Sequence, residues 1–408
     1  MKPRANATVA ALGLLYAAQG VPYGFASEYL PVALRQEHYS MGAIAALGWL
    51  QLPWQLKFLY ADLADRPAVS PYARRVLLAL QVGLFVAMTG FAWRSLHDSP
   101  RLWFALTFVA ALFASTQDIF VDAIAVRSLT SAQRGFGNTA QVAGYRLGML
   151  VGGAGLLLLI APLGSRFAVL ACASIVLVTG GAAFALRDSA PADRAVRPAA
   201  VRRSEAMTLV RHMFGRRAWP VVAVALTYKL GLHMAAFLIK PMVVDAHWTP
   251  QEIGAVVVTA GTTAGLAGAV AGGALHRWVP ESRALAFAAL LQSLVCLPLL
   301  LAHWAGAPKG MTTAAIVAEH FVTGAGTTVL FAALMSATRT RNAALHYTLL
   351  TSANSLAIGV GSTLGGLLAD HLGKSAVLAI AAVVGALPLG LLGRWSAAAA
   401  ASAENGED

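Results

Sequence analysis

The chain has 408 residues, of which 58% are hydrophobic and only 12% are charged. A soluble domain carries about 25% charged residues, so this composition excludes an ordinary soluble protein and indicates an integral membrane protein. The net charge of +12 is dispersed over short loops between apolar runs, which is typical of membrane topology rather than of nucleic-acid binding. We therefore expect a lipid bilayer as a partner and no nucleic acid.

Twelve apolar segments follow one another along the chain, each near the roughly 20 residues that cross a bilayer core of about 30 Å. Their runs are continuous rather than alternating, which predicts helices. The fold class is therefore an all-α membrane protein with twelve transmembrane helices. A kink is expected at Pro22 in the first segment, because proline removes a helix hydrogen bond. The segments cover residues 8–34, 42–61, 75–93, 102–125, 138–160, 166–186, 218–242, 251–275, 284–304, 311–335, 345–368 and 375–393.

Lysine and arginine gather at the N-terminus and in alternate loops. The positive-inside rule then predicts that both termini are cytoplasmic. Residues 188–217 are rich in arginine and hold Pro191 and Pro198. They predict a basic cytoplasmic linker between an N-terminal six-helix bundle, residues 1–187, and a C-terminal six-helix bundle with a short polar tail, residues 218–408.

The two halves carry a short repeat. GMLVGG at residues 148–153 matches GSTLGG at 361–366, and this register aligns Gln141 with Asn354. Parallel six-helix repeats around a central cavity are the major facilitator architecture. The glycines have GxxxG spacing, which permits close approach of two helices, so we interpret them as packing residues.

The loop ADLADR at residues 61–66 resembles the cytoplasmic signature loop of major facilitators. The resemblance implies a latch that stabilises one closed state. Residues at the cytoplasmic ends of the spans are candidates for this gate. They are Asp62, Asp65, Arg66, Asp122, Arg127 and Arg134.

Four further stretches are similar to the AmpG-type permeases, relatives of the acetyl-CoA transporter family and of a group of siderophore importers. They read LLYAAQGVPYGF (14–25), LPWQLKFLYADLADR (52–66), QDIFVDAIAVR (117–127) and QVAGYRLGM (141–149). The resemblance implies proton-coupled import of a small anionic solute such as anhydro-muropeptide across the bacterial inner membrane. Import of a siderophore or a metal–siderophore stays open as the alternative, because the siderophore importers share these N-terminal motifs.

The sequence contains no P-loop and no convincing set of nucleophile, base and orienting residue. We therefore expect a secondary transporter and not an enzyme, with no cofactor and no bound metal. The two cysteines lie inside apolar runs and suggest no disulfide framework. We expect the chain to act as a monomer.

Acidic residues within spans are the candidates for proton coupling, since a charged side chain in the lipid core is energetically costly and usually has a function. Asp118 and Asp122 lie four residues apart on one helical face, where two neighbouring carboxylates favour holding a proton. For Asp118 the alternative is a structural ion pair with Lys57, Arg127 or Arg134. Glu28 and Glu319 are the other two candidates. Glu28 is alternatively an interfacial acid near Arg35, and Glu319 alternatively balances Lys229.

Arg146 lies near the middle of its span and needs a partner, either a substrate anion or a protein carboxylate such as Asp118. Other polar and aromatic residues of the spans are expected to line the substrate cavity, although packing roles stay open for Trp54, His233 and His320. The expected substrate-binding residues are Arg146, Gln141, Tyr16, Gln19, Tyr23, Gln51, Trp54, Gln55, Tyr228, Lys229, His233, Tyr347 and Asn354.

Overall fold

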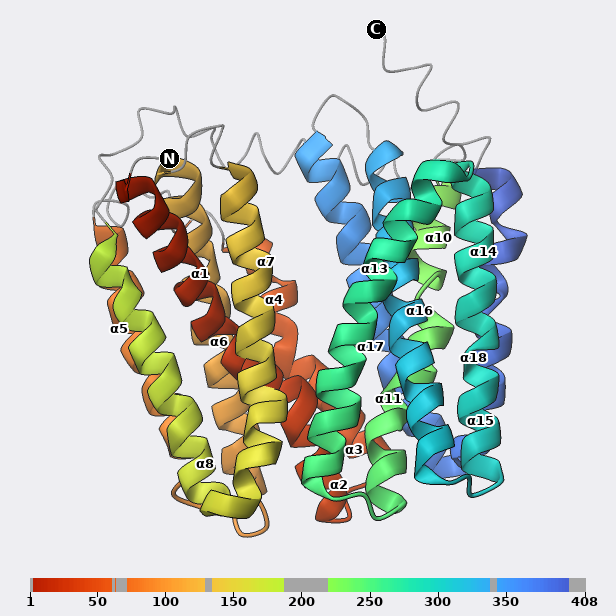
Figure 1. The fold of residues 1–408 in the computed structure, drawn as a ribbon, viewed down its shortest axis with the longest axis horizontal. Coiled ribbons are helices and arrows are strands. Elements are labelled where there is room, and N and C mark those ends of the chain that lie inside the picture. The colour runs from red at the N-terminus through yellow and green to blue at the C-terminus, as the bar shows by residue number, and fades with distance from the viewer. Residues whose placement is uncertain are drawn as a thin grey trace, which may run out of the picture. The chain divides into compact units, whose positions relative to one another are not determined.

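The computed structural model describes residues 3–60, 63, 72–128, 134–186, 219–337 and 343–395. Within these residues every regular element is a helix (Figure 1). In this described part, nine helices are long and apolar enough to cross a membrane by length and composition. One of them, Ala143–Ala185, covers two of the predicted segments. The prediction of an all-helical membrane protein is confirmed.

The helices of the first half match the first six apolar segments. They are α1 Pro3–Gly24, η1 Phe25–Tyr29, α2 Leu30–Gln36, α3 Met41–Ala45, η2 Ala46–Gln51, α4 Leu52–Gln55, η3 Lys57–Leu59, α5 Ala73–Gly90, α6 Pro100–Ser128, α7 Arg134–Leu150, η7 Val151–Gly155, α8 Leu156–Gly180 and η8 Gly181–Ala185.

The second half supplies the helices of the other six segments. They are α10 Trp219–Thr227, α11 Leu230–Asp245, α12 Pro250–Ile253, η9 Gly254–Ala260, α13 Gly261–Trp278, α14 Glu281–Leu294, α15 Cys296–Trp304, α16 Lys309–Ser336, α17 Ala343–Leu372, α18 Lys374–Gly385 and η10 Leu387–Gly390.

The second segment is not one continuous helix. It is divided into α3, η2, α4 and η3, and Pro53 opens α4. Proline is tolerated in the first turn of a helix but not in its interior, so a new helix begins here. In the first segment, helix α1 continues through Pro22 and ends at Gly24. The irregular turn follows it: residues Phe25–Tyr29 are π-helical.

The described chain forms two compact units, each of which includes a short segment from the other half of the sequence. Unit 1 comprises Met1–Tyr39, Leu47–Val196 and His247–Val258; unit 2 comprises Ser40–Ala46, Arg197–Ala246 and Thr259–Asp408. Within unit 2 the carboxylate of Asp370 accepts hydrogen bonds from the backbone amides of Met41 at 2.8 Å and Gly42 at 2.7 Å. The predicted linker, residues 188–217, lies outside the described residues.

The repeated glycines bring two helices together in each unit. A Cβ atom at Gly148 on α7 would lie only 2.0 Å from the carbonyl oxygen of Ala17 on α1. A Cβ atom at Gly361 on α17 would lie 2.5 Å from the carbonyl oxygen of Leu230 on α11. Both glycines are therefore required by close helix approach, at matching positions of the two units.

Candidate functional site

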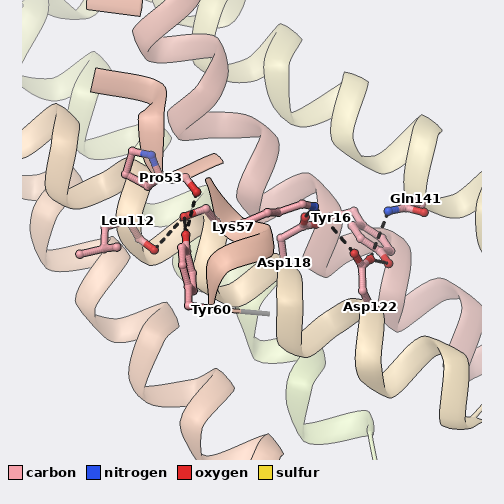
Figure 2. Close-up of polar contacts among 9 residues, drawn as sticks. Tyr16, Pro53, Lys57, Tyr60, Leu112, Asp118, Asp122 and Gln141 are labelled. Atoms are coloured by element: carbon pink, nitrogen blue, oxygen red, sulfur yellow. Dashed lines mark hydrogen bonds and ion pairs between the residues drawn. The ribbon is translucent and has the colours of Figure 1, made fainter. Parts of the chain in front are cut away.

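A cluster of three charged side chains lies inside unit 1 (Figure 2). The Nζ atom of Lys57 lies 2.5 Å from a carboxylate oxygen of Asp118 and 4.0 Å from one of Asp122. The Asp118 side chain is only 7% exposed, whereas those of Lys57 and Asp122 are 37% and 40% exposed. One ammonium group is thus shared by a buried carboxylate and a more accessible one.

Two neutral side chains complete this cluster from neighbouring helices. The Tyr16 hydroxyl on α1 donates to Oδ1 of Asp122 at 2.6 Å, and the Gln141 amide on α7 donates to the same oxygen at 3.2 Å (Figure 2). Asp122 is therefore held by a donor from each of two other helices, while Asp118 is held by Lys57. We call these five residues the ion cluster.

The break in the second segment places Lys57 in the ion cluster. The Tyr60 hydroxyl donates to the carbonyl oxygen of Pro53 at 2.7 Å and lies 2.9 Å from the Ser115 hydroxyl of α6. These contacts fix the short helices α4 and η3 against α6. A continuous helix would give Pro53 an interior position, where its ring clashes with the preceding turn.

Three half-buried aromatic rings meet beside the ion cluster. The ring centroids of Tyr23, Trp54 and Tyr145 are separated by 5.5 Å (Tyr23 to Tyr145), 5.8 Å (Trp54 to Tyr145) and 6.2 Å (Tyr23 to Trp54). Trp54 lies edge-on to both tyrosines, with interplanar angles of 79° and 74°, a favourable geometry for aromatic pairs. We call these three residues the aromatic triad.

Three parts of the chain carry members of both the ion cluster and the aromatic triad, whereas α6 carries only the two aspartates of the ion cluster. Tyr16 and Tyr23 both lie on α1, and Gln141 and Tyr145 lie four residues apart on α7. Lys57 in η3 follows Trp54 in α4 by three residues. A movement of one of these segments that changes the ion pair therefore also moves a ring of the triad.

Buried amide side chains accompany these residues. The side chains of Gln19 and Gln117 are fully buried, and neither amide has a hydrogen-bond partner among the described residues. Buried polar groups without partners are uncommon in folded proteins, and each calls for an explanation. Gln19 lies between Tyr16 and Tyr23 on α1, and Gln117 precedes Asp118 on α6, so both amides lie on the elements that carry the ion cluster.

Unit 2 holds a different polar network, which is almost fully buried. The Lys229 ammonium, 1% exposed, donates to the backbone carbonyl of Thr323 at 2.9 Å. The Glu319 carboxylate, 2% exposed, accepts from the Thr323 hydroxyl at 2.7 Å and lies 2.9 Å from the imidazole of His320. We call Lys229, Glu319, His320 and Thr323 the buried network.

The structure selects among the partners expected for the charged residues. Asp118 pairs with Lys57, one of its expected alternatives, and not with Arg146, because the broken second segment places the ammonium beside α6. Glu319 contacts His320 and Thr323, and it interacts electrostatically with Lys229 without a direct ion pair. Arg146 is half-buried and makes no hydrogen bond or ion pair with the described residues, which leaves its guanidinium available to an anion.

Three other expected residues have roles in the protein interior. Tyr228 is 1% exposed and donates to the backbone oxygen of Leu285 at 3.1 Å inside a hydrophobic core, so it does not line a cavity. Tyr16 is 2% exposed and its hydroxyl is occupied by Asp122. Gln141 belongs to the ion cluster and thus shares the neighbourhood of the expected gate residue Asp122.

The remaining expected residues are placed as follows. Glu28 is half-buried in the π-helical turn, close to Gly153. Gln51, Gln55 and His233 are half-buried, and Asn354 is 1% exposed with an unpartnered side-chain oxygen. Asp62, Asp65 and Arg66 lie outside the described residues, as do the side chains of Arg127, Arg134 and Tyr347.

Two contributors to the site were not predicted. Tyr145 completes the aromatic triad, and Tyr60 anchors η3. Tyr145 stands next to Arg146 in QVAGYRLGM, four residues after Gln141. The helical spacing of Gln141 and Tyr145 is the signal that identifies it.

Comparison with known proteins identifies a family and several relatives that are similar to this chain. The family model described as "Major Facilitator Superfamily" matches residues 10–345. An anhydromuropeptide permease of Escherichia coli strain K12 is 29% identical over 371 residues, which cover 89% of this chain and 74% of the relative. A putative transporter AmpG 4 of Rickettsia conorii is 22% identical and covers 87% of this chain and 88% of its own length.

Solved structures share the fold at low sequence identity. A D-xylose-proton symporter has a TM-score of 0.65 at 14% identity and covers 95% of this chain and 96% of its own. A bacterial homologue of the human lysosomal transporter Spinster, in an inward-facing and unoccupied conformation, has a TM-score of 0.65 at 12% identity. It covers 99% of this chain and 96% of its own.

Proposed function

The chain belongs to the major facilitator superfamily, and from this premise we propose that it imports an anionic solute together with protons, with an anhydro-muropeptide as the first candidate. It is a multi-pass membrane transporter, since its relatives are permeases rather than enzymes. The bacterial inner membrane is the proposed location. The similarity to an anhydromuropeptide permease over 89% of this chain supports the substrate.

One observation carries the proposal: three segments of the chain each contribute a residue to both the ion cluster and the aromatic triad. Lys57 is shared between Asp118 and Asp122. Protonation of Asp118 removes the charge that Lys57 pairs with, and the ammonium is then free to move toward Asp122. Because Trp54 in α4 lies only three residues before Lys57 in η3, such a movement displaces one ring of the triad.

The triad and Arg146 suit a substrate that combines sugar rings with carboxylates. Aromatic rings offer flat apolar faces for stacking, and the three rings are half-buried rather than sealed in the core. Arg146, the next residue after Tyr145, supplies a guanidinium that binds carboxylates in a bidentate manner. In this proposal the rings bind the sugar and Arg146 binds an acidic group.

Transport into proteoliposomes tests the coupling. With an acidic exterior, labelled anhydro-muropeptide should accumulate above its external concentration, and a protonophore should abolish this accumulation. The Asp118→Asn variant should lose accumulation but keep exchange of internal for external substrate, because exchange needs no net proton movement. Unchanged accumulation in Asp118→Asn would remove Asp118 from the coupling path.

A second pair of variants tests the triad. Tyr145→Ala should weaken substrate binding by about 0.5–1.5 kcal/mol, the value of one aromatic contact, while Tyr145→Phe should retain most of the affinity because it keeps the ring. A ferric siderophore serves as the competing substrate in the same assay. Accumulation of the siderophore and not of the muropeptide would show that the fold and coupling were correctly assigned but the substrate was not.

A further inference from the structure

A cavity of about 450 Å³ lies in unit 1, apart from the ion cluster and the triad. Most of its lining comes from the end of α2 with Glu37, the turn after α5 from Phe91 to Leu96, and α8 on both sides of Gly164; η1, α6 and α12 add Tyr29, Trp103 and Pro250. Gly164 adopts a positive φ of 77°, which non-glycine residues rarely adopt. The bend at Gly164 lies two residues before Arg166, a lining residue of the cavity.

The floor of this cavity is a rigid group of buried aromatic rings. Phe91 and Trp103 are 2% and 4% exposed, with ring centroids 5.0 Å apart. The Trp103 indole donates to the backbone oxygen of Arg94 at 3.0 Å and so fixes the turn above the floor. Leu157, Ile160 and Val169 add an aliphatic wall from α8. The lower part of the cavity is therefore preformed and apolar.

The cavity is lined by two arginines, Arg94 and Arg166, and by one carboxylate, Glu37, so its lining carries a net positive charge. Both arginines are exposed; Arg94 interacts electrostatically with Asp98 without a direct ion pair, and Arg166 forms no ion pair with a carboxylate within the described residues. The Arg166 guanidinium lies 5.2 Å from the centre of the Trp93 ring, in a cation–π contact. This contact orients the guanidinium and leaves its N–H edges available to an acceptor.

The cavity belongs to the lipid-facing surface. Trp93 on its rim is 69% exposed, and Phe167 and Leu163, next to the lining residues of α8, are 65% and 45% exposed. Large apolar side chains at such exposure in a membrane transporter contact acyl chains, and tryptophan with arginine is typical of the headgroup level. In the topology predicted from the basic residues, Arg94 and Arg166 are also among the few arginines on the outer side, against the positive-inside bias.

We propose that this cavity binds an anionic phospholipid of the surrounding leaflet. The phosphate lies between Arg94 and Arg166, and the first part of an acyl chain lies on Trp103 and the aliphatic wall of α8. In the predicted orientation this is the outer leaflet of the membrane. The site is separate from the substrate path and does not depend on the identity of the transported solute.

Native mass spectrometry of the purified chain with added lipid tests this site. Phosphatidylglycerol should bind in preference to phosphatidylcholine with the same acyl chains. The double variant Arg94→Ala/Arg166→Ala should weaken phosphatidylglycerol binding by about thirtyfold, since each basic residue near an anionic surface contributes about 1 kcal/mol. Arg101→Ala is the matched control, because Arg101 is exposed at the start of α6 but does not line the cavity.

Inorganic phosphate separates a lipid from a free anion. At millimolar concentration it should not displace phosphatidylglycerol, because it cannot occupy the apolar floor. Displacement by phosphate would show a free-anion site and overturn the lipid assignment. Equal binding of the two lipids, or an equal loss in Arg101→Ala, would overturn it as well. If the double variant does not fold, Trp93→Ala replaces it, with a smaller loss of phosphatidylglycerol binding expected.

Discussion

The two units use the same kinds of side chain in opposite ways. In unit 1 the side chain of Lys57 is 37% exposed, and its ammonium lies beside two carboxylates. In unit 2 the ammonium of Lys229 is 1% exposed and donates to a backbone carbonyl, and Glu319 is bound by Thr323 and His320. The ion cluster is thus accessible and offers Lys57 two alternative partners, whereas every member of the buried network is fixed.

From this difference we infer that the two units have different roles in transport. A charged group that changes partners during transport needs access to water or substrate and a second group with which it can pair. A fully buried group whose hydrogen bonds are satisfied instead stabilises one arrangement of its helices. We therefore expect the proton-dependent step to depend on Asp118 more than on Glu319, and the following variants test this comparison.

Removal of Lys57 should produce the largest effect. Lys57→Ala leaves the Asp118 carboxylate buried without its cation, which costs up to about 3–5 kcal/mol for a fully buried pair and somewhat less here because Lys57 is partly exposed. Thermal unfolding of the purified chain should show a clearly lowered midpoint. The double variant Lys57→Ala/Asp118→Asn should recover part of this loss; strictly additive losses would show that the two groups do not interact.

Glycine substitutions compare the helix contacts of the two units. Gly148→Ala should destabilise the chain by about 1–3 kcal/mol, because its new Cβ would lie 2.0 Å from the Ala17 carbonyl oxygen. Gly361→Ala, with a closest approach of 2.5 Å, should cost less. Gly359 lies on the same helix as Gly361, with no atom within 4 Å of the corresponding position.

Gly359→Ala is therefore the control for Gly148→Ala and for Gly361→Ala. It should leave the midpoint unchanged or raise it slightly, since alanine favours a helix over glycine by up to about 1 kcal/mol. The midpoints of all three variants are measured in one detergent. A loss in Gly359→Ala as large as that in Gly148→Ala would contradict the close-approach explanation.

Glu319→Gln should lower stability by about 1–2 kcal/mol, because a buried charge-assisted hydrogen bond is replaced by a neutral one. It should still accumulate substrate in response to a pH gradient, in contrast to Asp118→Asn. Proteoliposome uptake and the thermal midpoint are measured on the same preparation. If Glu319→Gln lost accumulation at an unchanged thermal midpoint, proton coupling would depend on Glu319 in unit 2, contrary to this expectation.

Tyr16→Phe should have the smallest effect. It removes the hydroxyl that donates to Asp122, a loss of about 1 kcal/mol, while Gln141 still donates to the same oxygen. The expected change is a shift in the pH dependence of uptake with nearly normal maximal rate. Gln141→Leu is the companion variant, and the two together should shift the pH profile further than either alone.

Apolar segments, glycine spacing and charge distribution were sufficient to predict a helical membrane protein of the major facilitator type. These features depend on local chain properties, because about 20 apolar residues define a span and a pair of glycines defines a close helix contact. Asp118 and Tyr23 could be selected for the same reason, since a polar residue within a span is conspicuous. The direction of insertion and the cytoplasmic linker stay predictions.

The partners of these residues depend on tertiary structure. The sequence placed Asp118 equally well beside Lys57 or Arg146, and only the break at Pro53, with Tyr60 bound to Ser115, brings the ammonium to α6. Tyr228 has the same polar ring as Tyr23, yet one lies in a core and the other in the aromatic triad. Helical spacing determines which residues share a face, but the rotation and contacts of each helix determine what that face meets.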